Sequence, residues 1–135
     1  MPGETNLQKL LGSMSPELLP GVFVFAMLPS GAPRPAGASP VMTFREREGV
    51  TLILREEEAR VAELPFAFRC RMITLNVHSS LEAVGFLAAI TVRLAAAGMG
   101  VNPVSAFCHD HLFVPADRAD EAIAILMDIV RENRD

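Results

Sequence analysis

The chain has 135 residues, of which 50% are hydrophobic, and a formal net charge of −4. This length suits one compact domain or two very small ones. Because the sequence has no basic run, nucleic-acid binding is not expected. The longest apolar region, residues 81–97, contains Glu82 and Arg93 and is too short and too charged to span a membrane. We expect no signal peptide, and we expect Cys70 and Cys108 to be reduced thiols in a cytoplasmic protein.

The first half predicts short elements separated by a proline-rich segment. Leu7, Leu10, Leu11 and Met14 have the spacing of one helix face, and the four prolines and two glycines of residues 29–40 exclude regular structure there. The other predicted elements are a buried strand over residues 22–28, a hairpin of residues 42–45 and 50–54, and a charged helix over residues 56–64.

The second half predicts most of a ferredoxin-like split unit. Residues 72–78 alternate as a half-buried strand, and residues 81–97 form a helix that is apolar on nearly every side. Gly98 and Gly100 end that helix, a second strand follows, and residues 112–114 form a third. A last amphipathic helix begins near Asp117, its expected N-cap. Strand, helix, strand, strand and helix are most of the split unit, and both halves contain strand pairs followed by a helix, so a degenerate duplication fits.

In such a unit the end of the first strand lies beside the start of the third. We therefore expect four polar side chains on one sheet edge: His78, His109, Asp110 and His111. The turn that follows the first strand faces the positive end of a helix dipole, where a small carboxylate can bind.

Three interpretations of this edge remain open. Ser79 and Ser80 could hold a carboxylate while Asp110 or Glu82 meets an ammonium. The three histidines could bind zinc, although His109 and His111 share a face that His78 need not share. The polar residues could instead be ordinary turn and cap chemistry.

Catalysis has less support in the sequence. Cys108 and His109 are neighbours in a strand, so their side chains point to opposite faces and do not form a nucleophile–base pair. Ser79 and Ser80 lack the Gly-x-Ser-x-Gly setting of a nucleophile elbow. We therefore do not expect an enzyme, a cofactor or a metal.

Several motifs together resemble the ACT-domain family, small regulatory modules that bind amino acids. Residues 97–105 are similar to a pattern of this family, in which a helix ends in a glycine and a short strand with an Asn between apolar residues follows. The whole chain resembles small stand-alone tandem ACT proteins, which are similar to the ACT pairs of aspartate kinases and cytosolic arginine sensors. The other matching segments are residues 20–24, 43–46, 48–54, 81–85 and 109–114.

The resemblance implies an α+β, ferredoxin-like ACT fold, with antiparallel sheets that carry helices on one face. Residues 1–66 would be a degenerate first unit, with the proline-rich segment in place of its first helix, and residues 67–135 the second unit. The second unit lacks an evident closing strand, and residues 22–28 are the candidate for it. A ligand site between two units is implied, with these residues: His78, Ser79, Ser80, Leu81, Glu82, Val84, Gly85, Asn102, His109, Asp110, His111 and, from the first unit, Thr51.

The resulting hypothesis is a non-catalytic module that binds a small amino acid effector and couples binding to self-association. The regulated partner would be a separate enzyme or another copy. The alternative is a structural or protein-interaction module that binds no ligand. Because residues 81–97 have more apolar surface than one sheet can cover, we also expect a homodimer.

Overall fold

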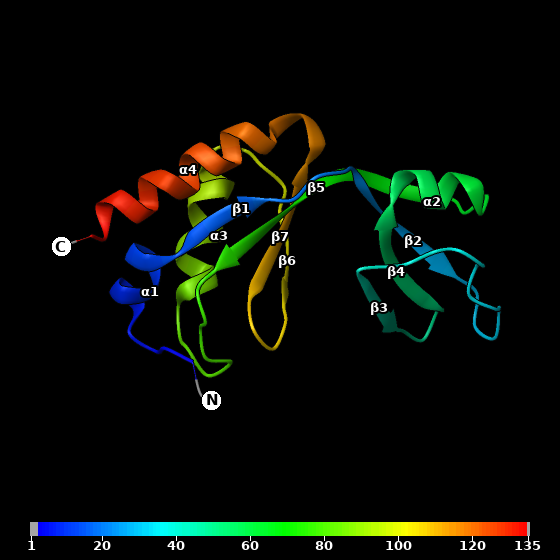
Figure 1. The fold of residues 1–135 in the computed structure, drawn as a ribbon, viewed down its shortest axis with the longest axis horizontal. Coiled ribbons are helices and arrows are strands. Elements are labelled where there is room, and N and C mark those ends of the chain that lie inside the picture. The colour runs from blue at the N-terminus through cyan, green and yellow to red at the C-terminus, as the bar shows by residue number, and fades with distance from the viewer. Residues whose placement is uncertain (1–2, 135) are drawn as a thin grey trace. The chain divides into compact units, whose positions relative to one another are not determined.

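The computed structural model describes residues 3–134, which form an α+β fold of antiparallel strands and helices (Figure 1). The helices are α1 (Leu7–Ser13), α2 (Glu56–Val61), α3 (Phe86–Ala96), the short 3₁₀ turn η1 (Ala116–Arg118) and α4 (Ala119–Glu132). The strands are β1 (Ser15–Leu18), β2 (Phe23–Leu28), β3 (Met42–Arg45), β4 (Val50–Arg55), β5 (Phe66–Asn76), β6 (Asn102–Ser105) and β7 (Asp110–Pro115).

Contacts divide the chain into two compact units, one of Met1–Pro20 with Arg71–Asp135 and the other of Gly21–Cys70. We call the first the pocket unit, because it contains the pocket described below. We call the second the inner unit, because it lies between the two segments of the first in the sequence. Strand β5 begins in the inner unit and ends in the pocket unit. The expected division into residues 1–66 and 67–135 follows chain order, whereas the contacts group the first twenty residues with the second half of the chain. The expected division remains a prediction.

The pocket unit contains a sheet covered on one face by α1, α3 and α4 (Figure 1). Strand β1 pairs antiparallel with the end of β5, Leu18 opposite Ile73, and β6 pairs antiparallel with β7. The alternation expected for residues 72–78 is confirmed for Ile73 and Leu75, which are fully buried in the core under the helices. Thr74, on the other face, is also buried, and the strand ends at Asn76. Leu112 and Val114 of β7 and Leu126 of α4 belong to the same core.

The inner unit has the strand order β3-β4-β2-β5, with α2 on one face. The hairpin expected at residues 42–54 is confirmed by the pairing of Phe44 with Thr51. The core between this sheet and α2 consists of Val24, Ala26, Leu28, Leu52, Leu54 and Ala59. No helix lies in residues 29–40, as the prolines predict.

Three local expectations are wrong. The strand that fills the closing position beside the end of β5 is β1, while residues 23–28 pair with β4 and the start of β5. Helix α3 begins at Phe86 and not at residue 81, because residues 77–85 form a looped segment. Asp117 does not cap the last helix, since it lies within η1, and Arg118 precedes α4 without a capping side-chain hydrogen bond. Among the helices of residues 3–134, none is both long and apolar enough to cross a membrane.

Candidate functional site

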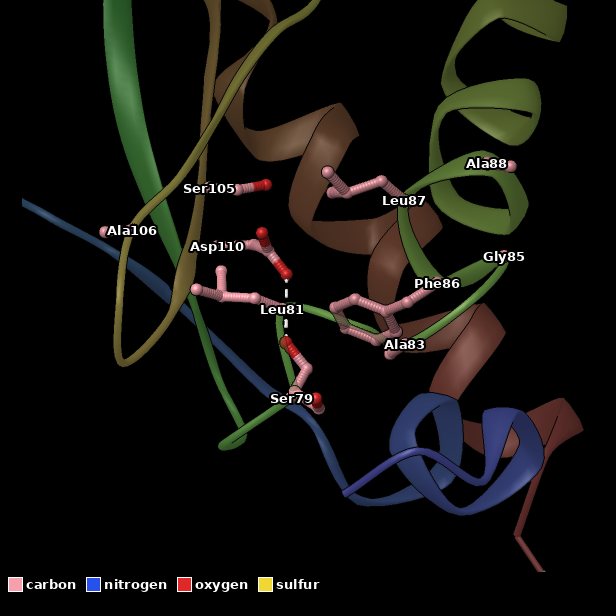
Figure 2. A pocket seen from close by; sticks show the side chains of 11 residues that line it. Ser79, Leu81, Ala83, Gly85, Phe86, Leu87, Ala88, Ser105, Ala106 and Asp110 are labelled. Atoms are coloured by element: carbon pink, nitrogen blue, oxygen red, sulfur yellow. Dashed lines mark hydrogen bonds between the residues drawn. The ribbon is translucent and has the colours of Figure 1, made fainter. Parts of the chain in front are cut away.

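A pocket of about 170 Å³ lies in the pocket unit, where the loop between β5 and α3 faces the β6–β7 hairpin (Figure 2). Its wall combines the loop, the first turn of α3 and the facing ends of β6 and β7. The lining residues are Ser79, Ser80, Leu81, Ala83, Gly85, Phe86, Leu87, Ala88, Ser105, Ala106 and Asp110. The side chain of Phe86 points from the start of α3 toward Leu81, across the pocket floor (Figure 2).

The loop is shaped by its own backbone and by one hydroxyl. Ser80 Oγ accepts a hydrogen bond of 3.0 Å from the Glu82 N–H, and the Ser80 carbonyl accepts one of 3.0 Å from the Ala83 N–H. Gly85 then adopts a left-handed backbone with φ of 93°, directly before the first helical residue, Phe86. A side chain is disfavoured at that φ, so glycine is the residue that allows the loop to turn into α3.

The segment before α1 holds the loop from outside the pocket. The Glu4 N–H donates to the His78 carbonyl at 2.9 Å, and the Ser80 N–H donates to the Glu4 carbonyl at 3.0 Å. The approach is so close that a Cβ on Gly3 would lie 2.5 Å from the Ser80 nitrogen. We call residues 3–6 the N-terminal strap. Because the strap uses the Ser80 N–H, this amide is engaged within the chain.

Asp110 is the polar centre of the pocket. Its side chain is 8% exposed, and its Oδ2 accepts a hydrogen bond of 3.1 Å from the Ser79 hydroxyl, which is also buried (Figure 2). Ser105 lies directly opposite Asp110 in the β6–β7 ladder. Among the residues that line the pocket, Asp110 is the one with an ionisable side chain. The pocket therefore presents one negative charge among hydroxyl and apolar groups.

The start of α3 gives the opposite wall a partial positive charge. The first backbone N–H groups of a helix have no partner within it, and they form the positive end of its dipole. In α3 the i−4 ladder begins with the Ala89 N–H, which donates to the Gly85 carbonyl at 2.9 Å. Phe86, Leu87 and Ala88 precede that bond and line the pocket. One wall thus suits a cation and the other suits an anion.

The histidines lie elsewhere. His109 and His111 alternate with Asp110 along the strand, so their side chains point to the opposite face of the sheet. There His111 Nδ1 lies 3.0 Å from Thr74 Oγ1, and the two imidazole rings have centroids 6.5 Å apart. Burial, followed by the charge of His109, lowers the pKa of His111, while Asp110 opposes the shift. Among residues 3–134, no three His, Cys, Asp or Glu side chains are grouped as metal ligands.

The structure brings together five of the twelve residues named from the sequence. Ser79, Ser80, Leu81, Gly85 and Asp110 line the pocket. His78 and Glu82 line a separate recess beside the same loop, together with Gly3 and Phe107.

The remaining five are not in the pocket. Val84 is 84% exposed, and Asn102 lies opposite Phe113 at the far end of β6. His109 and His111 are on the other sheet face. Thr51 belongs to β4 of the inner unit, where its hydroxyl donates to Glu46.

Sequence reasoning missed six lining residues: Ala83, Phe86, Leu87, Ala88, Ser105 and Ala106. Ser105 could have been found from the hairpin register, because it pairs with Asp110. Phe86 to Ala88 were missed because the helix was expected to begin five residues earlier. Small apolar residues such as Ala83 and Ala106 have no distinguishing signal in the sequence.

The comparison with protein families decides what kind of domain this is. One model of the ACT domain matches residues 2–71, and a second matches residues 67–128. The chain belongs to the ACT-domain family. Two matches in succession identify a tandem of ACT domains, and membership implies a regulatory, ligand-binding module. No curated protein matched the chain.

Solved structures support the same fold. A Vibrio cholerae protein of unknown function, labelled a possible transport protein, is 40% identical over 92% of this chain and 95% of its own, with a TM-score of 0.83. An Agrobacterium tumefaciens protein is 17% identical over 87% and 89% of the two chains, with a TM-score of 0.74. The ligand-free regulatory subunit of aspartate kinase from Thermus thermophilus is 10% identical over 87% and 99%, with a TM-score of 0.63. The last two similarities concern the fold alone.

Proposed function

We propose that this tandem ACT protein is a non-catalytic regulatory module that binds a small amino acid in the pocket beside α3. The observation that supports this most directly is that one small pocket is lined both by a buried carboxylate, Asp110, and by the first turn of α3. An ammonium group would meet Asp110, and a carboxylate would meet the helix N–H groups. An α-amino acid has both groups on one carbon atom.

The polar groups of the pocket favour binding over catalysis. A nucleophilic serine needs a base to take its proton. Ser79 donates its hydrogen bond to the Asp110 carboxylate, and a carboxylate is in general a weaker base than an imidazole; no histidine or cysteine lines the pocket. Cys108, the exposed thiol at the hairpin, is outside it. These contacts agree with a module that holds a ligand without transforming it.

A thermal-shift screen of the twenty amino acids tests the proposal, followed by calorimetry on any that bind. A ligand that binds only the native state raises the melting temperature, and the increase grows with the ratio of ligand concentration to Kd. We expect one or a few amino acids to do so. If none shifts the transition at millimolar concentration, the alternative function, a protein-interaction module without a ligand, replaces this one.

We further propose that binding is coupled to self-association. The outward side of α3 is apolar, with Val92 63% exposed and the small residues Ala88, Ala95 and Ala96 also exposed. A helix usually exposes polar residues on its solvent side, so this surface is suited to a second copy. Because Ala88 also lines the pocket, a ligand and a second copy would contact the same helix. The effect of binding would then pass to another copy or to a separate enzyme.

A further inference from the structure

We infer that the pocket selects small amino acids whose side chains carry no charge. This inference rests on the proposed function, because it specifies the ligand of the same pocket. It goes beyond the family resemblance, which is compatible with acidic, basic and neutral effectors alike.

The pocket can neutralise one charge of each sign on a ligand. Asp110 supplies one full charge, and the first turn of α3 supplies a partial charge of the opposite sign. The α-ammonium and α-carboxylate of an amino acid use both. A third ionised group, on the side chain of the ligand, would be taken out of water without a partner, which is costly. An acidic side chain would in addition be repelled by Asp110.

The rest of the pocket wall is uncharged. Apart from Asp110, its side chains are either apolar, as in Leu81, Phe86 and Leu87, or neutral hydroxyls, as in Ser80 and Ser105. Such a wall can contact methyl and hydroxyl groups of a ligand. Neither lysine nor arginine lines the pocket, so no cation is present to pair with an acidic ligand side chain.

The pocket is also small. The pocket volume of about 170 Å³ lies below the roughly 300–1,000 Å³ of sites for drug-sized molecules. An engineered apolar cavity of about 150 Å³ holds benzene, a single six-carbon ring. Alanine, serine and threonine have comparable sizes, whereas arginine and phenylalanine are much larger. The expected ligand is therefore small as well as neutral.

Glu82 is the acidic residue that could bind a basic ligand side chain from outside the pocket. Glu82 lines the recess that residues 79–81 also line, and it does not line the pocket itself. A lysine or arginine that reached around Leu81 could pair with Glu82. Binding of a basic amino acid that is lost in Glu82→Gln would identify this arrangement and overturn the inference.

Calorimetry with ligands matched in shape separates charge from size. Asparagine and aspartate differ in charge but little in volume, and so do glutamine and glutamate. Phenylalanine differs from alanine, serine and threonine in volume but not in charge. We expect each neutral ligand that binds to do so at least about tenfold more tightly than its charged counterpart, and small ligands to bind more tightly than phenylalanine.

The failure of this inference differs from the failure of the proposed function. If aspartate, glutamate, lysine or arginine binds as tightly as the neutral amino acids, the proposed selectivity is wrong, while the proposed amino acid binding is supported. Phenylalanine binding as tightly as alanine would also overturn it. If no amino acid binds at all, both fail together.

Discussion

Ser79 and Asp110 are 31 residues apart in the chain, yet the Ser79 hydroxyl donates a hydrogen bond of 3.1 Å to Asp110 Oδ2. Each residue is only 8% exposed. The bond joins the loop before α3 to the first residue of β7, and so connects the two sides of the pocket. Its acceptor is also the group that we expect to meet a ligand ammonium.

The first prediction concerns Asp110→Asn. This change removes the charge and keeps the shape, so the fold should persist while ligand affinity falls. A hydrogen bond to a charged group contributes about 1.5–3 kcal/mol, which corresponds to a loss of roughly 10- to 150-fold. Calorimetry with an amino acid found in the screen measures the loss. Asp117→Asn, at an exposed position in η1, is the control and should bind normally. Unchanged affinity in Asp110→Asn would remove Asp110 from the site.

The second prediction is a pH dependence from His111. Because burial lowers its pKa below 6.5, the unfolded chain binds more protons than the folded protein between that lowered pKa and about pH 6.5. The contribution of His111 to the free energy of unfolding should therefore fall as the pH drops through this window. Below the folded-state pKa, His111 causes no further loss.

Urea unfolding at a series of pH values, compared between unmodified protein and His111→Gln, measures this contribution. Glutamine can still hydrogen-bond Thr74 but does not titrate, so the slope of stability against pH should be shallower in the variant. His78→Gln, which removes an exposed histidine, is the control. Parallel slopes for the His111 variant and the unmodified protein would show that His111 does not contribute.

The third prediction concerns the N-terminal strap. Even the Cβ of Gly3→Ala would lie within 2.6 Å of Ser79 and Ser80 backbone atoms, so the strap must move away from the loop. The two hydrogen bonds of Glu4 to His78 and Ser80 would then weaken, at a cost of about 1–3 kcal/mol in the free energy of unfolding.

Hydrogen exchange at the Ser80 amide should become faster in this variant, and ligand affinity should fall because the loop is less ordered. Gly100→Ala provides a matched control, since no atom lies within 4 Å of a Cβ at that position. Equal protection of Ser80 in both variants would mean that the strap does not order the loop.

The fourth prediction is that the protein forms a homodimer through α3. Val92→Glu places a charge on the apolar outward side of the helix and should give monomers or aggregates by light scattering. Val61→Glu, on α2, alters a valine that is 85% exposed and should leave the assembly unchanged. A monomer of the unmodified protein at high micromolar concentration would refute the dimer and, with it, the coupling to self-association.

The fifth prediction is that the two thiols differ in reactivity. Cys70 is fully buried, its thiol donates to the Phe23 carbonyl at 3.3 Å, and burial raises its pKa to about 12. Cys108 is exposed. Because the thiolate is the reactive form, an alkylating reagent near pH 8 should modify Cys108 alone in the native protein, and Cys70 only in denaturant. Rapid modification of both thiols without denaturant would contradict the burial of Cys70.

Alternation and hairpin signals predicted much of the fold from the residues alone. Ile73 and Leu75 identify the buried face of β5, and the expected meeting of the β5 end with the β7 start is confirmed by the bond between Ser79 and Asp110. The first feature follows from the local periodicity of the sequence. The second follows from the general handedness of strand–helix–strand connections, once the order of the elements is known.

Other features depend on tertiary contacts that local patterns do not contain. Residues 15–18, Ser-Pro-Glu-Leu, have no strand pattern, and they extend because β5 offers a free edge and Leu18 packs on the core. The start of α3 was misplaced because residues 81–84 also fit a helix. The left-handed Gly85 and the turn around Ser80 move that start to Phe86.

The grouping of residues 3–20 with residues 71–134 has a consequence for synthesis on the ribosome. Chains emerge from the N-terminus at roughly 5–20 residues per second, and compact units fold as they become complete. Strands β2, β3 and β4, helix α2 and the start of β5 lie between Gly21 and Cys70, so the inner unit can fold first. Helix α1 and β1, although made earlier, have no sheet to join until β5 has emerged, and no α4 to pack against until residues 119–132 have emerged. During that interval Leu10 and Leu11, which are buried in the folded unit, have no core to pack into.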